Sequence, residues 1–91
     1  MAKVTIDHVR TALREINVST AERMSDTALK NADFLHNLGM NEGKLFSMMN
    51  ILEKKLGIML PTGVTDSLQA KNTVAVFITA ANHYLIDLSK Q

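Results

Sequence analysis

The chain lacks cysteine and tryptophan, and its 91 residues include only one proline, four glycines and 4% aromatic residues. Without cysteine the protein cannot form a disulfide, a thiolate zinc site or a cysteine nucleophile. The scarcity of proline and glycine favours a helical domain over a turn-rich β fold. Long hydrophobic runs are also lacking, and a membrane-spanning helix needs roughly 20 apolar residues. We therefore expect an all-α protein without membrane insertion.

The chain also has almost no excess of positive over negative charge. Ten basic and nine acidic residues leave a net charge of +1, which is too small to indicate a nucleic-acid or membrane partner. The 46% apolar content is typical of a globular protein, and the length predicts one domain over residues 1–91. The first residues carry charge early and show no apolar signal region, so we expect a cytoplasmic protein.

Apolar residues at helical spacing predict two long helices in the first two thirds of the chain. The first helix is expected over residues 5–16, with Thr5 or Asp7 at its beginning. The second is expected over residues 42–56. Asn41 can cap its beginning, and Gly57 can end it because glycine readily adopts a left-handed conformation.

The last third of the chain predicts two more helices. One is short and covers residues 66–70, whereas the final helix is long and covers residues 74–88. Thr65 or Asp66 can cap the short helix, and Asn72 or Thr73 can cap the final helix.

Residues 19–40 show no regular period. A long connection without structure is uncommon in a compact domain, so we expect an ordered loop held by its scattered apolar residues, with one short helical turn over 21–24. Three long helices, one short helix and this long ordered first loop together predict a four-helix bundle with one helix reduced.

Eight apolar side chains of the second and last helices are predicted to form one core, and Tyr84 is expected in it with its hydroxyl at the rim. The methionines near the second helix allow two interpretations, namely core packing, which continues the leucine stripe, or an adaptable apolar binding groove. The eight core residues are Leu45, Met48, Leu52, Leu56, Val74, Phe77, Ile78 and Leu85.

Neither a metal site nor a catalytic site is indicated. His8, His36 and His83 fall in separate segments without metal-ligand spacing, and a catalytic histidine would need a positioned partner. The sequence has no glycine-rich phosphate loop, zinc signature or nucleophile elbow. We therefore expect a protein that is not an enzyme.

The stretch over residues 31–61 resembles acyl carrier proteins. In that family a loop phenylalanine precedes Asp-Leu-Gly-x-Asp-Ser-Leu, a helix runs to a leucine-acidic-acidic pattern, and an apolar-proline pair follows. The beginning of the final helix at Thr73 and its end near Tyr84 also look like the family's last helix. The resemblance implies a four-helix carrier bundle. The matching residues are Phe34, Leu38, Gly39, Leu52, Glu53, Leu56, Leu60 and Pro61.

The attachment motif departs from this resemblance. In carriers its serine holds 4′-phosphopantetheine through a phosphodiester, and that serine corresponds to Glu42 here, between Asn41 and Gly43. A carboxylate cannot replace the attacking hydroxyl, so the resemblance does not support this cofactor at Glu42. Asp66-Ser67-Leu68 reproduces the tripeptide later in the chain, which makes Ser67 a weak alternative attachment site.

The charge of the second helix is the other departure. Carriers are usually acidic and dock through this helix onto basic patches, whereas here it carries three lysines against only two acids, Glu42 and Glu53. Like charges repel wrong partners, so we expect a protein partner with an acidic or apolar docking face. The residues expected to touch it are Met40, Gly43, Lys44, Phe46 and Lys54.

Three functional hypotheses remain open. The first is a non-catalytic, acyl-carrier-like module that acts by protein–protein contact in a lipid or polyketide pathway. The second is a genuine acyl or peptidyl carrier for fatty-acid or polyketide metabolism, loaded at the unconventional Ser67. The third is a regulator with the carrier fold that binds an acyl group in its core without a covalent arm.

Overall fold

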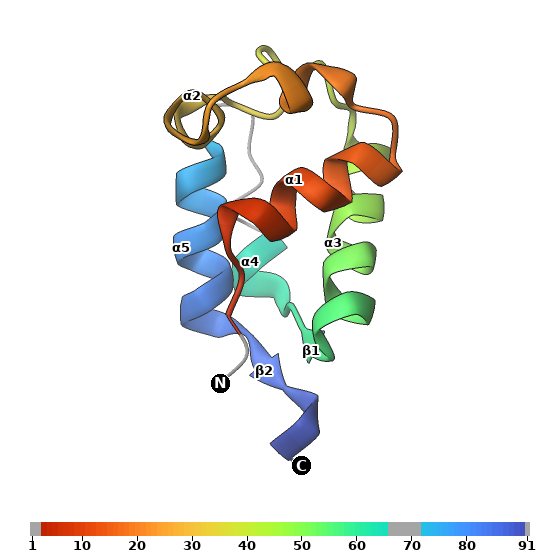
Figure 1. Ribbon diagram of the computed structural model, residues 1–91. Coiled ribbons are helices and arrows are strands. Elements are labelled where there is room, and N and C mark those ends of the chain that lie inside the picture. The colour runs from red at the N-terminus through yellow and green to blue at the C-terminus, as the bar shows by residue number, and fades with distance from the viewer. Residues whose placement is uncertain (1–2, 66–71, 91) are drawn as a thin grey trace.

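The computed structural model describes residues 3–65 and 72–90, which form a mostly helical fold with one small antiparallel pair of strands. Two long helices, α3 and α5, run in the same direction, and α1 crosses in front of them (Figure 1). The elements are α1 (Ile6–Glu15), the 3₁₀ turn η1 (Ser19–Arg23), α2 (Asp26–Asn31), α3 (Glu42–Leu56), β1 (Ile58–Met59), α4 (Thr62–Thr65), α5 (Val74–Tyr84), β2 (Ile86–Asp87) and the 3₁₀ turn η2 (Leu88–Lys90).

Side-chain caps set the beginnings of the long helices, close to the predicted positions. Asn41 accepts the Lys44 N–H at the start of α3, and Thr73 accepts the Val76 N–H at the start of α5. Such caps satisfy backbone donors that have no partner inside the helix. Gly57 ends α3 with φ 63° and ψ 45°, the left-handed geometry expected of this residue.

The segment between α1 and α3 is more helical than the sequence indicated. The predicted turn over 21–24 appears as η1, but α2 was not anticipated. The side chain of Ser25 caps α2 by accepting the Ala28 N–H at 3.1 Å. Arg10 of α1 holds η1 and the residue after it against α1, because one of its guanidinium nitrogens donates to the carbonyls of Ala21 and Met24 at 2.6 and 2.8 Å.

The last helix is shorter than predicted, because the expected end at residue 88 was wrong. Helix α5 ends at Tyr84, and β2 then pairs with β1 in the register Ile58↔Asp87 and Met59↔Ile86. Leu88 therefore lies beyond the helix and is 43% exposed instead of facing the core. Tyr84 is also outside the core, with 48% of its surface exposed.

The short helix predicted over 66–70 falls in residues 66–71, outside the described part of the chain. What the structure describes just before it is α4, which begins earlier, at Thr62. Helix α4 packs against α5, where a Cβ added to Gly63 would lie only 3.1 Å from the ring of Tyr84. A glycine at this position lets the two helices approach closely.

Packing around α5 and α3 defines the core. Phe34 from the loop and Phe77 from α5 are both fully buried, with ring centroids 5.7 Å apart in an edge-to-face arrangement. Five of the eight predicted core residues are buried, and the other three are partly buried against the same cluster. The buried five are Leu45, Met48, Leu52, Val74 and Phe77, and the partly buried three are Leu56, Ile78 and Leu85.

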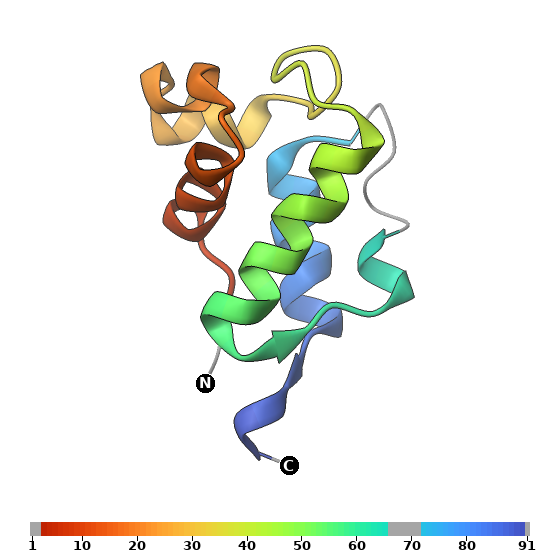
Figure 2. The ribbon, with the colours of Figure 1, turned by 90° about the vertical axis from the view of Figure 1, so that its right-hand side faces the viewer.

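The N-terminal arm is fastened to the last helix. The amide of Asn82 accepts the Val4 N–H at 2.7 Å and donates to the Val4 carbonyl at 2.9 Å. Val4 itself is 1% exposed. The views in Figures 1 and 2 agree that this arm and β2 lie at one end of the molecule, whereas α3 begins at the other end.

We predict that Phe77→Ala lowers the free energy of unfolding by about 3–5 kcal/mol, because it removes a buried ring and leaves a cavity beside Phe34. Urea unfolding monitored by circular dichroism measures the change. Val76→Ala is the matched control on the same helix, since Val76 is 45% exposed and its truncation should cost about 0.5 kcal/mol or less. Equal losses for the two variants would contradict the assigned core.

Candidate functional site

The beginning of α3 is where the resemblance places a prosthetic group. Asn41 is the N-cap, and its side-chain oxygen accepts the Lys44 N–H at 2.8 Å. Glu42 is the first helical residue and is exposed. A carboxylate there interacts favourably with the helix dipole, which typically contributes about 0.3–1 kcal/mol at an exposed site. Glu42 therefore has a structural role that does not depend on any cofactor.

The residues at this position do not fit 4′-phosphopantetheine. Attachment requires a hydroxyl that attacks phosphorus, and Glu42 offers only carboxylate oxygens. Gly43 leaves room for a side chain, since an added Cβ would meet only Asn41 Oδ1 at 3.4 Å. The alternative attachment residue, Ser67, lies outside the described residues.

Four of the five residues predicted to touch a partner lie on α3, and we call this set the docking surface: Gly43, Lys44, Phe46 and Lys54. Phe46 is 45% exposed, Gly43 and Lys54 are exposed, and Lys44 is partly buried. A single exposed phenylalanine is common on protein surfaces, so its exposure makes the ring accessible but does not by itself identify a partner.

Met40 does not belong to this surface, although the sequence suggested that it would touch a partner. Its side chain is only 3% exposed and joins the core cluster. The reason is the loop before α3, in which the Met40 N–H donates to the Phe34 carbonyl at 2.9 Å and holds the residue against the core.

The other methionines near α3 differ in burial. Met48 and Met49 are buried with the leucines of the helix, as core packing requires. Met59 on β1 is 46% exposed and lies beside Ile86 across the strand pair. Core packing thus accounts for both α3 methionines, and the exposed one lies beyond the helix.

Asp33 organises the loop that leads to α3. Its Oδ1 accepts the backbone N–H groups of His36 and Asn37, and its Oδ2 lies 3.4 Å from His36 Nδ1. Desolvation would raise the pKa of the Asp33 carboxyl, but these hydrogen bonds and the His36 ring together hold that pKa below its ordinary value of 3.8. The carboxylate is thus a structural acceptor for a tight turn.

The three histidines lie apart from one another and make different contacts. His8 completes the N-terminal cap of α1, His36 contacts Asp33, and the ring of His83 meets that of Tyr84 edge-to-face at 4.6 Å. Across residues 3–65 and 72–90, no group of three or more histidine, aspartate or glutamate side chains is placed to hold a metal ion.

Comparison of the chain with protein-family models, with curated proteins and with solved structures gives no match. Among the helices that the structure describes, none is both long and apolar enough to cross a membrane.

Sequence reasoning missed two features near the site. Helix α2 carries a recognisable signal, because Ser25 is followed by Asp26 and can cap a helix. The turn at Asp33 follows the Asx pattern, in which a side-chain oxygen accepts N–H groups a few residues later. Neither signal involves hydrophobic periodicity, the pattern that predicts the long helices.

We predict that the stabilising effect of Asp33 disappears in acid. Because its folded-state pKa lies below 3.8, the ionised carboxylate stabilises the fold above about pH 4, and this contribution is lost as the pH falls through the folded pKa. Asp33→Asn keeps an acceptor oxygen but cannot ionise. Urea unfolding at pH 7, 5 and 3 should show the wild type more stable at pH 7 and the difference shrinking toward pH 3. Parallel pH profiles would contradict the prediction.

Proposed function

We propose that this chain is a non-enzymatic, acyl-carrier-like module that lacks the phosphopantetheine arm and acts by contact with a protein partner through the docking surface on α3. The observation that carries the proposal is the beginning of α3. Glu42, at the position where the resemblance puts the attachment serine, is exposed, and Phe46 is exposed one turn later.

The order and lengths of the helices support a carrier-like bundle as the finer description of the fold. The order α1, α3, α4 and α5 is the order that the resemblance implies for its four helices, whereas α2 is an additional short helix in the connection between α1 and α3. Two residues of the resemblance are also in contact, because Glu53 accepts the Leu60 N–H at 2.9 Å. This bond joins the end of α3 to the Leu60-Pro61 turn.

The charge of the docking surface indicates the chemistry of the partner. Lys54 is exposed, Lys44 is partly buried, and Phe46 lies between them in sequence. Complementary charge speeds association, whereas like charge across an interface costs several kcal/mol. A partner with an acidic rim around an apolar pocket fits these residues, and a basic carrier-binding patch does not.

We predict that the wild-type chain keeps its apo mass after incubation with coenzyme A and a broad-specificity phosphopantetheinyl transferase, because Glu42 offers no hydroxyl. Intact-mass spectrometry measures the result. The triple variant Asn41→Asp, Glu42→Ser and Gly43→Leu restores the attachment motif and should gain one arm. Gly43 is exposed and accepts an added Cβ in ordinary van der Waals contact, and the aspartate that replaces Asn41 is an equally good N-cap.

Addition of one arm to the wild-type chain would overturn this part of the proposal. Ser67→Ala is then the decisive comparison, because loss of the adduct would identify the chain as a genuine carrier loaded at Ser67. A triple variant that stays unmodified while folded would show instead that the alignment of Glu42 with the attachment serine is wrong.

We also predict that the chain does not bind a ketosynthase that prefers acidic carriers, because lysines of the docking surface face its basic patch. Isothermal titration calorimetry of the chain against the ketosynthase measures the binding, and an acidic carrier titrated against the same enzyme is the positive control. Reversal of charge in Lys44→Glu with Lys54→Glu should create measurable binding. Micromolar binding by the wild type, unchanged in Lys44→Ala and Lys54→Ala, would contradict the charge argument.

A further inference from the structure

A groove of about 270 Å³ lies between α1 and α3, apart from the docking surface. Its apolar floor is Leu52, which is buried, and Leu56, which is partly buried. His8 and Thr11 of α1 and Lys55 of α3 complete its lining. Apolar surface together with a few polar groups is the usual composition of a small-molecule site.

The cap of α1 fixes which nitrogen of His8 carries the proton. His8 Nδ1 accepts the Thr5 N–H at 3.1 Å, while the His8 N–H donates to Thr5 Oγ1 at 3.3 Å. An imidazole nitrogen that accepts a hydrogen bond is unprotonated, so the neutral ring holds its proton on Nε2. His8 lines the groove, and Nε2–H is the ring donor that it can offer to a ligand because Nδ1 is engaged by Thr5.

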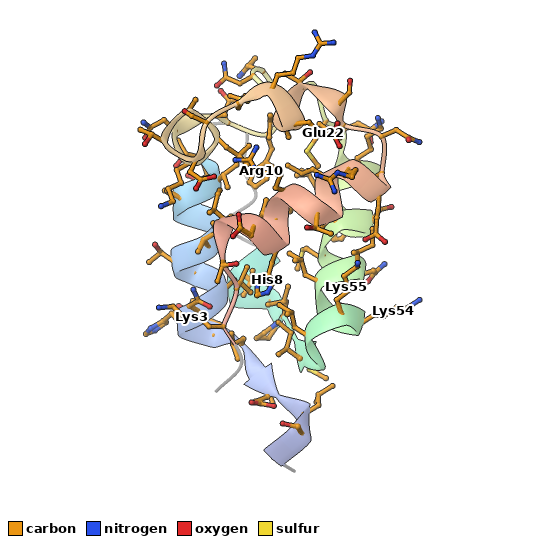
Figure 3. The ribbon with its side chains drawn as sticks, viewed as in Figure 1. Lys3, His8, Arg10, Glu22, Lys54 and Lys55 are labelled. Atoms are coloured by element: carbon orange, nitrogen blue, oxygen red, sulfur yellow. The ribbon has the colours of Figure 1, made fainter. Side chains whose placement is uncertain are left out.

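Lys55 supplies the positive charge. Its Nζ lies 3.3 Å from Glu15 Oε2, and both side chains are about half exposed, at 46% and 44%. Exposed pairs of this kind are weak, so the ammonium can turn to another anion at little cost. Figure 3 shows Lys55 extending toward α1, whereas its neighbour Lys54 points outward from α3.

We propose that this groove binds a short aliphatic carboxylate, with the carboxylate held by Lys55, His8 Nε2–H and the Thr11 hydroxyl and the alkyl chain on Leu52 and Leu56. The three polar groups match an anionic head, because a carboxylate accepts several hydrogen bonds and the ammonium neutralises it. The apolar floor requires a tail, so a bare anion satisfies only half of the groove.

The groove is separate from the docking surface and needs no prosthetic arm. Its residues lie on the side of α3 that faces α1. The groove is slightly smaller than the roughly 300–1,000 Å³ of drug-sized sites, which limits the occupant to a small molecule. Such a ligand has few atoms, and we expect a dissociation constant on the order of 1 mM.

The test is a titration of the full chain with sodium hexanoate, followed by ¹H–¹⁵N NMR at the amides of Thr11, Leu52 and Leu56. Saturable shifts are expected there. Acetate, hexanamide and inorganic phosphate serve as comparison ligands at equal ionic strength, and each should bind at least about tenfold more weakly, because it lacks the tail or the carboxylate. Equal binding of any one of them would overturn the proposal.

Variants of the groove separate specific recognition from diffuse charge. His8→Glu keeps a capping box with Thr5, so α1 stays capped, but it places a negative charge in the groove and should weaken hexanoate binding at least about tenfold. Lys55→Ala should weaken binding about threefold, whereas Lys54→Ala, the matched control, should leave it unchanged. Equal effects of the two lysine variants would overturn the site.

Glu15→Gln provides a test in the opposite direction. It frees Lys55 from its partner and removes a nearby negative charge, so hexanoate should bind roughly two- to threefold more tightly. Unchanged or weaker binding in this variant would show that Lys55 does not hold the carboxylate.

Discussion

The contact between Phe34 and Phe77 determines where the beginning of α3 can lie. Phe77 belongs to α5, and Phe34 belongs to the loop that leads to α3, so this pair of rings joins two segments distant in sequence. Backbone bonds reinforce the junction, because the Val74 N–H donates to the Ala32 carbonyl at 2.9 Å and Asp33 bridges to Thr73. The aromatic contact and these backbone bonds together position the cap of α3 relative to the core.

Local signals were sufficient where a helix carries its own caps and one apolar stripe. Residues 42–56 have Asn41 before them and Gly57 after them, and the observed helix has the predicted bounds. The end of α5 lacked such a signal, since Leu85 and Leu88 continue the helical spacing. Only pairing with β1, a partner distant in sequence, turns this segment into a strand, and tertiary contacts of that kind cannot be inferred from periodicity.

In the candidate site, too, some features follow from local sequence and others depend on tertiary contacts. The exposure of Glu42 and Phe46 follows from helix position and spacing, which the sequence contains. The burial of Met40 does not, because it depends on the bond to the Phe34 carbonyl across a loop of irregular conformation. The groove beside Lys55 could not be predicted from the sequence either, because it exists only where α1 and α3 cross. The bonds from Arg10 to the loop after α1 could not be predicted for a similar reason, since their acceptors are backbone carbonyls that no side-chain pattern identifies.

The two hydrogen bonds between Val4 and Asn82 have a practical consequence for attaching this protein to something else. They hold the N-terminal arm beside the end of α5, from which β2 continues, so both arms of the chain leave the helical body at one end (Figures 1 and 2). The first turn of α3 lies at the opposite end. A bead, a surface or a neighbouring domain joined through either arm would therefore sit at the end of the molecule opposite the beginning of α3, where Glu42 is exposed.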